Sequence, residues 1–261
     1  MSNGRPFTLA PKTNACGISH TGRVRRRNED ALYISPDGLL LIVADGMGGH
    51  LAGEVASTLG VQEVADFVTA DRMQRVVAGD LEARALLTEA TQSAHRRIHD
   101  VARSRPDCRG MGTTLVVGLI VRDRLWVCHV GDSRAYLSTG DGLHQLTQDH
   151  SVVGALIRSG KLPPGAARTH PRRSQISRAL GLEEDPEPDV TTAVLHPGDM
   201  VVLCSDGLWE MLQDEELSAI LAEKTDLPSR AETLVRRACE AGGHDNVTVA
   251  LYAHPGSKDS P

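Results

Sequence analysis

The chain has 261 residues, a formal net charge of −6 and an aromatic content of only 3%. This length can bury a sizeable core, which must consist mainly of Val, Leu, Ile and Ala. The acidic balance argues against a general binder of nucleic acid or of anionic membranes. No apolar stretch reaches the length of a membrane span, and the five cysteines form no C-x-x-C pair. We therefore expect a cytoplasmic protein without structural zinc.

The first half of the chain begins with strands and continues with helices. Residues 31–34 and 38–45 are predicted strands, joined by a Pro-Asp-Gly turn that is typical of a hairpin. Apolar residues then recur three or four positions apart, which predicts helices over 51–68 and 81–102.

A run of strands comes next, followed by a polar stretch. Residues 113–123, 124–132 and 134–139 are rich in β-branched side chains and are predicted strands. Pro163 and the polar residues around it predict a loop near 158–175.

The last part of the chain returns to a mixture of elements. The predictions are a strand at 200–206, helices at 214–224 and 229–241, and a strand at 246–252. Most strands are joined as hairpins, so the element order favours antiparallel sheets flanked by helices, an α+β fold, over a βαβ repeat.

The stretch VADGMGGH, residues 43–50, resembles a phosphate-binding loop but fails each test. A dinucleotide fingerprint G-x-G-x-x-G would need Gly at position 51, which is Leu51. A nucleotide P-loop needs a Gly-Lys pair, and no Lys is near. The downstream motifs of a kinase are also missing. The glycines therefore do not indicate nucleotide binding.

Carboxylates stand at or just outside the ends of five predicted strands. Any one of them alone is explained as a turn residue or a helix cap. Five in one domain are harder to explain, because carboxylates brought together repel each other unless cations lie between them. The residues are Asp45, Asp132, Asp206, Asp245 and the pair Glu29-Asp30.

Ligands that offer only oxygen select the type of cation. Carboxylates, carbonyls and waters suit Mg²⁺ or Mn²⁺, and no His/Cys cluster has zinc spacing. Two such ions, about 3.5–4 Å apart, can share one carboxylate and activate a bridging water. Glycines after Asp45 would let the backbone carbonyl of Gly46 approach a metal.

At this point the sequence resembles the metal-dependent PPM/PP2C-type Ser/Thr protein phosphatases in their compact bacterial form. The resemblance covers about residues 13–253, with tails at 1–12 and 254–261. It depends on eight motifs in the expected order: VRRRNED (24–30), VADGMGGHLAGE (43–54), GMGTTL (110–115), HVGDSRAYL (129–137), LTQDHS (146–151), HPRRSQISRALG (170–181), CSDGLWEML (204–212) and GGHDNVTVAL (242–251).

The resemblance implies a fold and a set of metal ligands. The fold would be a central antiparallel β-sandwich with helices on both faces and a flap at about 151–175. Asp45 would bridge two metals, and the Gly46 carbonyl would bind one of them. Asp206 and Asp245 would hold the other metal. Glu29 would contact metal-bound water, and Asp132 would serve a third, weaker metal.

The implied reaction is direct attack of a metal-bridging water on phosphoserine or phosphothreonine, with no phosphoenzyme. Arg25 matches the phosphate-binding arginine of the family, since a guanidinium binds a phosphate dianion without competing for the metals. Met47 stands where eukaryotic members have His, so His50 is the candidate proton donor, with a metal-bound water as the alternative.

Two other functions remain open on the sequence alone. An inactive phosphatase-like regulatory module should have lost a ligand, yet Asp45, Asp206 and Asp245 are all present. A hydrolase of small phosphomonoesters would use the same chemistry. The expected partners are phosphorylated proteins, among them a Ser/Thr kinase and its targets, and the expected state is a monomer.

Overall fold

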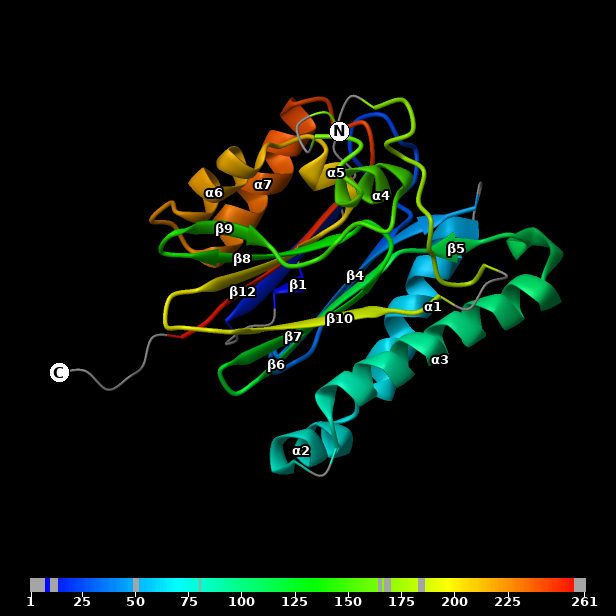
Figure 1. Ribbon diagram of the computed structural model, residues 1–261, viewed down its shortest axis with the longest axis horizontal. Helices are drawn as coiled ribbons and strands as arrows, with labels where there is room; N and C mark the ends of the chain where they lie inside the picture. Colours follow the sequence, from blue (N-terminus) through cyan, green and yellow to red (C-terminus); the bar gives the residue numbers. More distant parts are fainter. Residues whose placement is uncertain are drawn as a thin grey trace.

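Two antiparallel sheets lie face to face at the centre of the molecule (Figure 1). The computed structural model describes residues 8–9, 14–48, 52–79, 81–163, 166, 170–182 and 186–255. In spatial order, the first sheet contains β1 (Thr8–Leu9), β2 (Ala15–His20), β12 (Val247–Ala253), β11 (Met200–Cys204), β8 (Arg134–Thr139) and β9 (Gly142–Gln145).

The second sheet is also antiparallel. In spatial order it contains β10 (Asp189–Val194), β7 (Arg124–Val130), β6 (Leu115–Val121), β4 (Leu40–Met47) and β3 (Asp30–Ile34), while β5 (Gly112–Thr113) pairs with the end of β4. Between the two sheets lies a buried aliphatic layer that includes Val43, Val116, Val201 and Leu203. Its β-branched content explains why these segments are strands.

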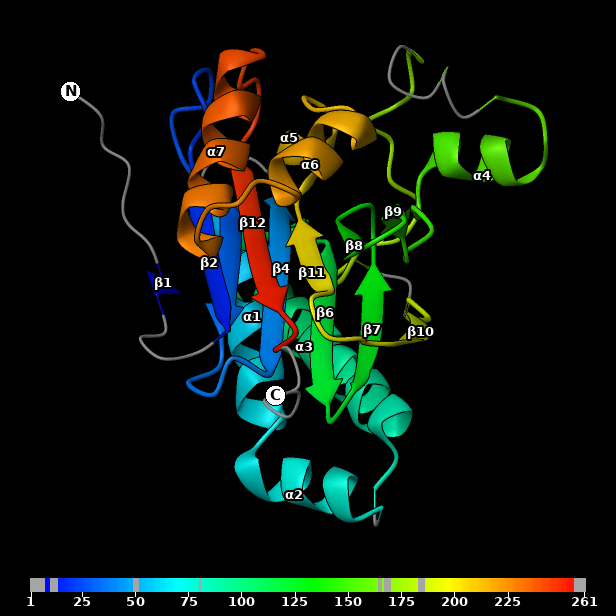
Figure 2. The same cartoon turned by 90° about the vertical axis from the view of Figure 1, so that its left-hand side faces the viewer.

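Helices cover the outer face of each sheet. On the second sheet lie α1 (Ala52–Phe67) and α3 (Ala83–Ser104), followed by the 3₁₀ turn η1 (Pro106–Cys108), while α2 (Ala70–Ala78) joins the two long helices. On the first sheet lie α5 (Asp206–Trp209), α6 (Asp214–Leu221) and α7 (Leu227–Glu240). A further helix, α4 (Val152–Arg158), projects away from both sheets (Figure 2).

The predicted stripe of α3 is confirmed, because Leu86, Ala90, Ala94 and Ile98 are all buried against the second sheet. With one apolar layer between the sheets and one under each set of helices, the molecule has α-β-β-α layers. The predicted α+β class and layered sandwich are therefore confirmed. Among the described residues, no helix is both long and apolar enough to cross a bilayer.

Several boundaries differ from the predictions. The predicted strand 113–123 is divided at Thr114, whose backbone and hydroxyl both bond to the backbone of Asp45. The predicted strand 200–206 ends at Cys204, and Asp206 is instead the first residue of α5. Within the predicted tail at 1–12, Thr8 and Leu9 pair with β2.

Candidate functional site

The two sheets bring the predicted carboxylates to one end of the sandwich. In the second sheet, β3 and β4 place Asp30 directly opposite Asp45. In the first sheet, neighbouring β11 and β12 place Asp206 just after one strand and Asp245 just before the other. Residues far apart in sequence thus form one acidic cluster.

Electrostatics shows that these carboxylates affect one another strongly. Burial raises the pKa of Asp45 well above its usual range, and the charges of Asp206 and Asp30 raise it further. Burial likewise raises the pKa of Asp206, and Asp132 and Asp245 add to the effect. A cluster of this kind costs free energy when all its members are ionised, and a cation between them removes that cost.

Two glycines allow the backbones around the cluster to approach closely. A Cβ at Gly46 would collide with the carbonyl oxygen of Gly53. A Cβ at Gly207 would collide with the carbonyl oxygen of Asn246, which follows Asp245. The Asp-Gly pairs at 45–46 and 206–207 therefore bring the acidic side chains together instead of forming simple turns.

The donor atoms fit a hard divalent cation. The side chain of Asp206 has a buried Oδ1 with no hydrogen-bond partner, which is costly unless the oxygen meets a cation or a water. The nearby groups are carboxylates and backbone carbonyls, the oxygen ligands that Mg²⁺ and Mn²⁺ prefer. Asp45, Asp206 and Asp245 therefore offer the donor type that such an ion needs, and their role as ligands stays a prediction.

Asp30 is a buried carboxylate of the cluster to which the sequence assigned no role. Its Oδ2 accepts hydrogen bonds from Ser205 Oγ at 2.7 Å and Thr248 Oγ1 at 2.6 Å, whereas its Oδ1 has no partner. Ser205 directly follows β11, and Thr248 lies in β12. Because both strands belong to the first sheet and Asp30 belongs to the second, these hydrogen bonds connect the two sheets. The pair Glu29-Asp30 is visible in the sequence, but the family resemblance implies a role only for Glu29.

Arg25 and Glu29 lie beside the cluster. Arg25 Nη2 donates to Asp245 Oδ2 at 2.6 Å, and its side chain is 55% exposed. The backbone N–H of Glu29 donates to Asn246 Oδ1 at 2.7 Å, which fixes Glu29 against the start of β12. Burial raises the pKa of the Glu29 carboxyl even though Arg25 is near.

Asp132 lies between the cluster and an ion pair whose two side chains are each 12% exposed. Its side chain is buried, and its backbone carbonyl accepts a hydrogen bond from Trp209 Nε1 at 3.0 Å. Arg134 stacks on the Trp209 ring and donates to both carboxylate oxygens of Asp149, at 2.9 and 2.7 Å. Burial, and then the charge of Asp149, raise the pKa of Asp132.

Two predicted features are described only in part or not at all: His50 and the flap. His50, the candidate proton donor, lies outside the described residues. In the segment 151–175, Arg173 Nε lies 3.8 Å from Glu210 Oε2, and Glu210 is one of the charges that raise the pKa of Asp206. Part of this segment therefore lies near the acidic cluster.

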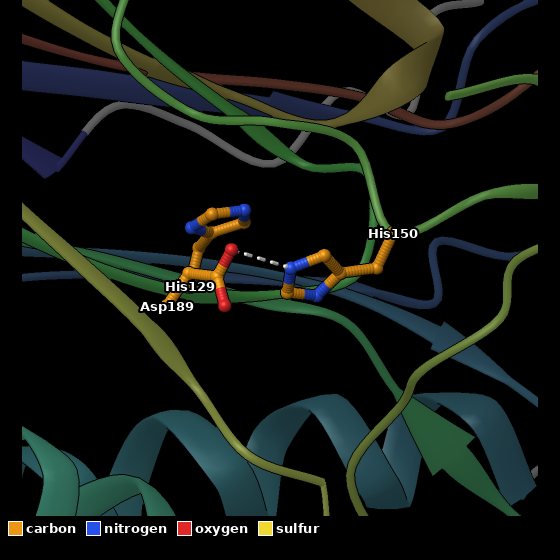
Figure 3. A group of neighbouring side chains, drawn as sticks. All are labelled: His129, His150 and Asp189. Atoms are coloured by element: carbon orange, nitrogen blue, oxygen red, sulfur yellow. Dashed lines mark ion pairs between the residues drawn. The ribbon is translucent and has the colours of Figure 1, made fainter. Parts of the chain in front are cut away.

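A different trio of potential metal ligands lies at the start of this segment (Figure 3). The donor atoms of His129, His150 and Asp189 all lie within 4.8 Å of one another, and no other trio of His, Cys, Asp or Glu among the described residues is as compact. The carboxylates of the acidic cluster are spaced more widely, so a cation there would be completed by water and by the carbonyl of Gly46.

Comparison with known proteins agrees with this geometry. A family model described as "Protein phosphatase 2C" matches residues 16–236. The Serine/threonine phosphatase stp of Listeria innocua is 38% identical over 233 residues, covering 88% of this chain and 91% of that protein. Protein phosphatase PhpP of Streptococcus pneumoniae is 37% identical over 239 residues, covering 90% and 95%.

Solved structures are similar over nearly the same range. The Mycobacterium tuberculosis serine/threonine phosphatase PstP/Ppp has a TM-score of 0.83 and 37% identity, covering 92% of this chain and 98% of that one. A second structure, the catalytic domain of PstP in complex with two manganese ions, has a TM-score of 0.78 and 35% identity, covering 92% and 97%.

Proposed function

The chain belongs to the protein phosphatase 2C family and is a bacterial-type serine/threonine phosphatase, and we propose that its acidic cluster is the binuclear metal centre of this enzyme. The proposed ligands are Asp45, Asp206, Asp245 and the carbonyl oxygen of Gly46. The observation that supports this most is the buried, unpartnered Oδ1 of Asp206 among carboxylates that raise its pKa.

When bound, two Mg²⁺ or Mn²⁺ ions would supply Lewis acidity and an activated water for in-line displacement at phosphorus. The residues of the chain have supporting roles. Asp45, on β4 of the second sheet, and Asp206, at the start of α5 just after β11 of the first sheet, would both be ligands of the metals. Asp30 would hold the ends of β11 and β12 in place through its hydrogen bonds with Ser205 and Thr248. Glu29 would accept a hydrogen bond from water at the centre.

Arg25 is proposed to bind the phosphate of the substrate. Its guanidinium lies at the mouth of the cluster, where it pairs with Asp245. Because this side chain is more than half exposed, it can turn from the carboxylate toward a phosphate without unpacking the core. Arg26 and Arg27 are exposed and are assigned no role in catalysis.

Asp132 and His50 are assigned roles beside the two central metals. Asp132 is buried and its charge acts on Asp206, which supports a third cation beside the first two. His50 is proposed as the donor of a proton to the leaving serine or threonine oxygen, with water as the alternative.

The substrates are phosphorylated proteins, and we propose that a Ser/Thr kinase and its targets in the cytoplasm are among them. We also propose that the phosphatase acts as a monomer, with one domain over 13–253. Neither an inactive regulatory module nor a hydrolase of small phosphomonoesters is favoured by any observation on this chain, since the complete set of proposed ligands is present.

Hydrolysis of an aryl phosphate and of a phosphothreonine peptide tests the proposed centre. We expect activity with Mn²⁺, none with EDTA, and a large loss in Asp206→Asn. The matched control is Asp141→Asn, an exposed carboxylate on the β8–β9 turn. Activity that persists in EDTA, or a fully active Asp206→Asn enzyme, would contradict the assignment.

A further inference from the structure

The two ends of the segment 151–175 meet where the segment leaves and rejoins the sandwich. The N–H of Ser177 donates to the carbonyl of His150 at 2.7 Å, and the N–H of Val152 donates to the carbonyl of Gln175 at 2.9 Å. Side chains from the same place, those of His150 and Arg178, converge on Asp189 at the start of β10. The three side chains are called here the flap-base clasp.

Hydrogen bonding fixes the proton on the His150 ring. The backbone N–H of Gly131 donates to Nδ1 of His150 at 3.2 Å, so this nitrogen carries a lone pair. The ring proton must then be on Nε2, which faces Asp189 Oδ2 at 3.2 Å (Figure 3). His150 is therefore a neutral donor to a carboxylate.

Arg178 completes the clasp on the other oxygen of Asp189. Its Nη1 donates to Asp189 Oδ1 at 3.2 Å and to the carbonyl of Glu187 at 3.3 Å. The same Nη1 lies 3.3 Å from Nε2 of His150, but both atoms bear hydrogens, so this approach is a contact and not a hydrogen bond.

These bonds argue against a metal ion at His129, His150 and Asp189. A metal would need the lone pair of Nε2 on His150, whereas the lone pair of the neutral ring is on Nδ1. His129 does have a buried Nδ1 without a partner, but its ring stacks on His150 with centroids 4.6 Å apart. Arg178 already supplies a positive charge beside Asp189, so a second cation would be repelled.

The residues just before Arg178 connect the clasp to the acidic cluster. Only a few residues before Arg178, the side chain of Arg173 reaches Glu210, at the C-terminal end of α5. Asp206 is the first residue of α5. On its other side the clasp is anchored to the second sheet, because β10 pairs with β7 and Asp189 lies opposite His129.

We infer that His150 and Asp189 are positioning residues, which together with Arg178 hold the segment 170–178 at a fixed place beside the acidic cluster. The inference depends on the proposed metal centre being the catalytic site. On this inference the segment would contact the protein part of a phosphorylated substrate, because it lies beside the acidic cluster and supplies none of the proposed metal ligands. The clasp should therefore affect the affinity for phosphopeptides more than the chemistry.

Asp189→Ala and His150→Asn are the variants that break the clasp. In His150→Asn, the side-chain oxygen can still accept from Gly131, while the bond to Asp189 is lost. Asp189→Asn is the partial rescue variant, because its amide oxygen can accept from Nε2 of His150, whereas its NH2 group cannot accept from Arg178. Glu240→Ala, which removes an exposed ion pair with Arg236 on α7, is the matched control.

Steady-state kinetics on two substrates gives the first readout. We expect Asp189→Ala and His150→Asn to raise KM for a phosphothreonine peptide by about three- to tenfold. We expect kcat and KM for an aryl phosphate to change by less than about twofold. Equal losses on both substrates would overturn the inference, as would an unchanged peptide KM.

Limited trypsin digestion gives a readout that does not depend on activity. Arg158 and Lys161 lie in the segment that the clasp closes, and cleavage after them should be about tenfold faster in Asp189→Ala than in Glu240→Ala. Asp189→Asn should return part of the protection, through the bond to His150 alone. Unchanged cleavage would overturn the clasp even if the enzyme were inactive, so its failure is distinguishable from failure of the proposed function.

Discussion

Lowering the pH should destabilise the protein through His150. The ring is 2% exposed, and it faces the His129 ring, the Asp189 carboxylate and the Arg178 guanidinium. Burial, and then the charge of His129, lower the pKa of His150 from its ordinary value of 6.5 to about 4. The unfolded chain therefore binds a proton between these values that the folded chain does not, so stability is present above pH 6.5 and is lost as pH falls.

The magnitude follows from the difference in pKa. A gap of about 2.5 units corresponds to at most about 3 kcal/mol, of which about 2 kcal/mol is lost between pH 7 and pH 5. Urea denaturation at both pH values, for the native protein and for His150→Asn, isolates this contribution. Between pH 7 and pH 5, the free energy of unfolding should fall by about 2 kcal/mol more in the native protein than in His150→Asn. Losses that agree within about 0.5 kcal/mol would refute both the tautomer and the burial argument.

Two further substitutions test the close approach and the phosphate site. Gly207→Ala should lower the free energy of unfolding by about 1–3 kcal/mol and reduce activity, because its Cβ would collide with the carbonyl of Asn246. Gly140→Ala, where no atom lies within 4 Å of the new Cβ, should cost little, and equal costs in urea denaturation would count against the reasoning. Arg25→Ala should raise KM for phosphomonoesters by about tenfold and lower kcat less, whereas Arg26→Ala should change neither.

The regular parts of the fold were predictable because their patterns are local. Residues 40–44 of β4 and most of β6 are continuous apolar runs, since both of their faces are buried. The helical stripe of α3 is equally clear. The buried positions of Cys128 and Cys204 also agree with their apolar sequence context.

Two strands that the sequence did not predict lack a clear strand pattern. Strand β10, with the sequence DVTTAV, is an edge strand of half-buried and exposed residues, so it lacks an apolar run. Strand β2 contains Gly17, which lowers its strand propensity, yet a Cβ there would meet Leu32 of the facing sheet.

The acidic cluster was predictable as a set of residues but not as a geometry. Strand ends identified Asp45, Asp206 and Asp245, whereas the buried role of Asp30 depends on Ser205 and Thr248, which come from distant parts of the chain. The clasp was not predictable either, because it also consists of contacts between distant parts of the chain. Its residues belong to different elements, and only the fold brings them within hydrogen-bonding distance.

Calorimetric titration with Mn²⁺ tests the central claim most directly. The native protein should bind at least two ions, and Asp206→Asn should lose one of them or bind it at least about tenfold more weakly. In metal-free buffer the variant should remain as stable as the native protein or more so, because Asn removes a repelling charge from the buried cluster. A variant that is folded and binds Mn²⁺ with the stoichiometry and affinity of the native protein would contradict the account.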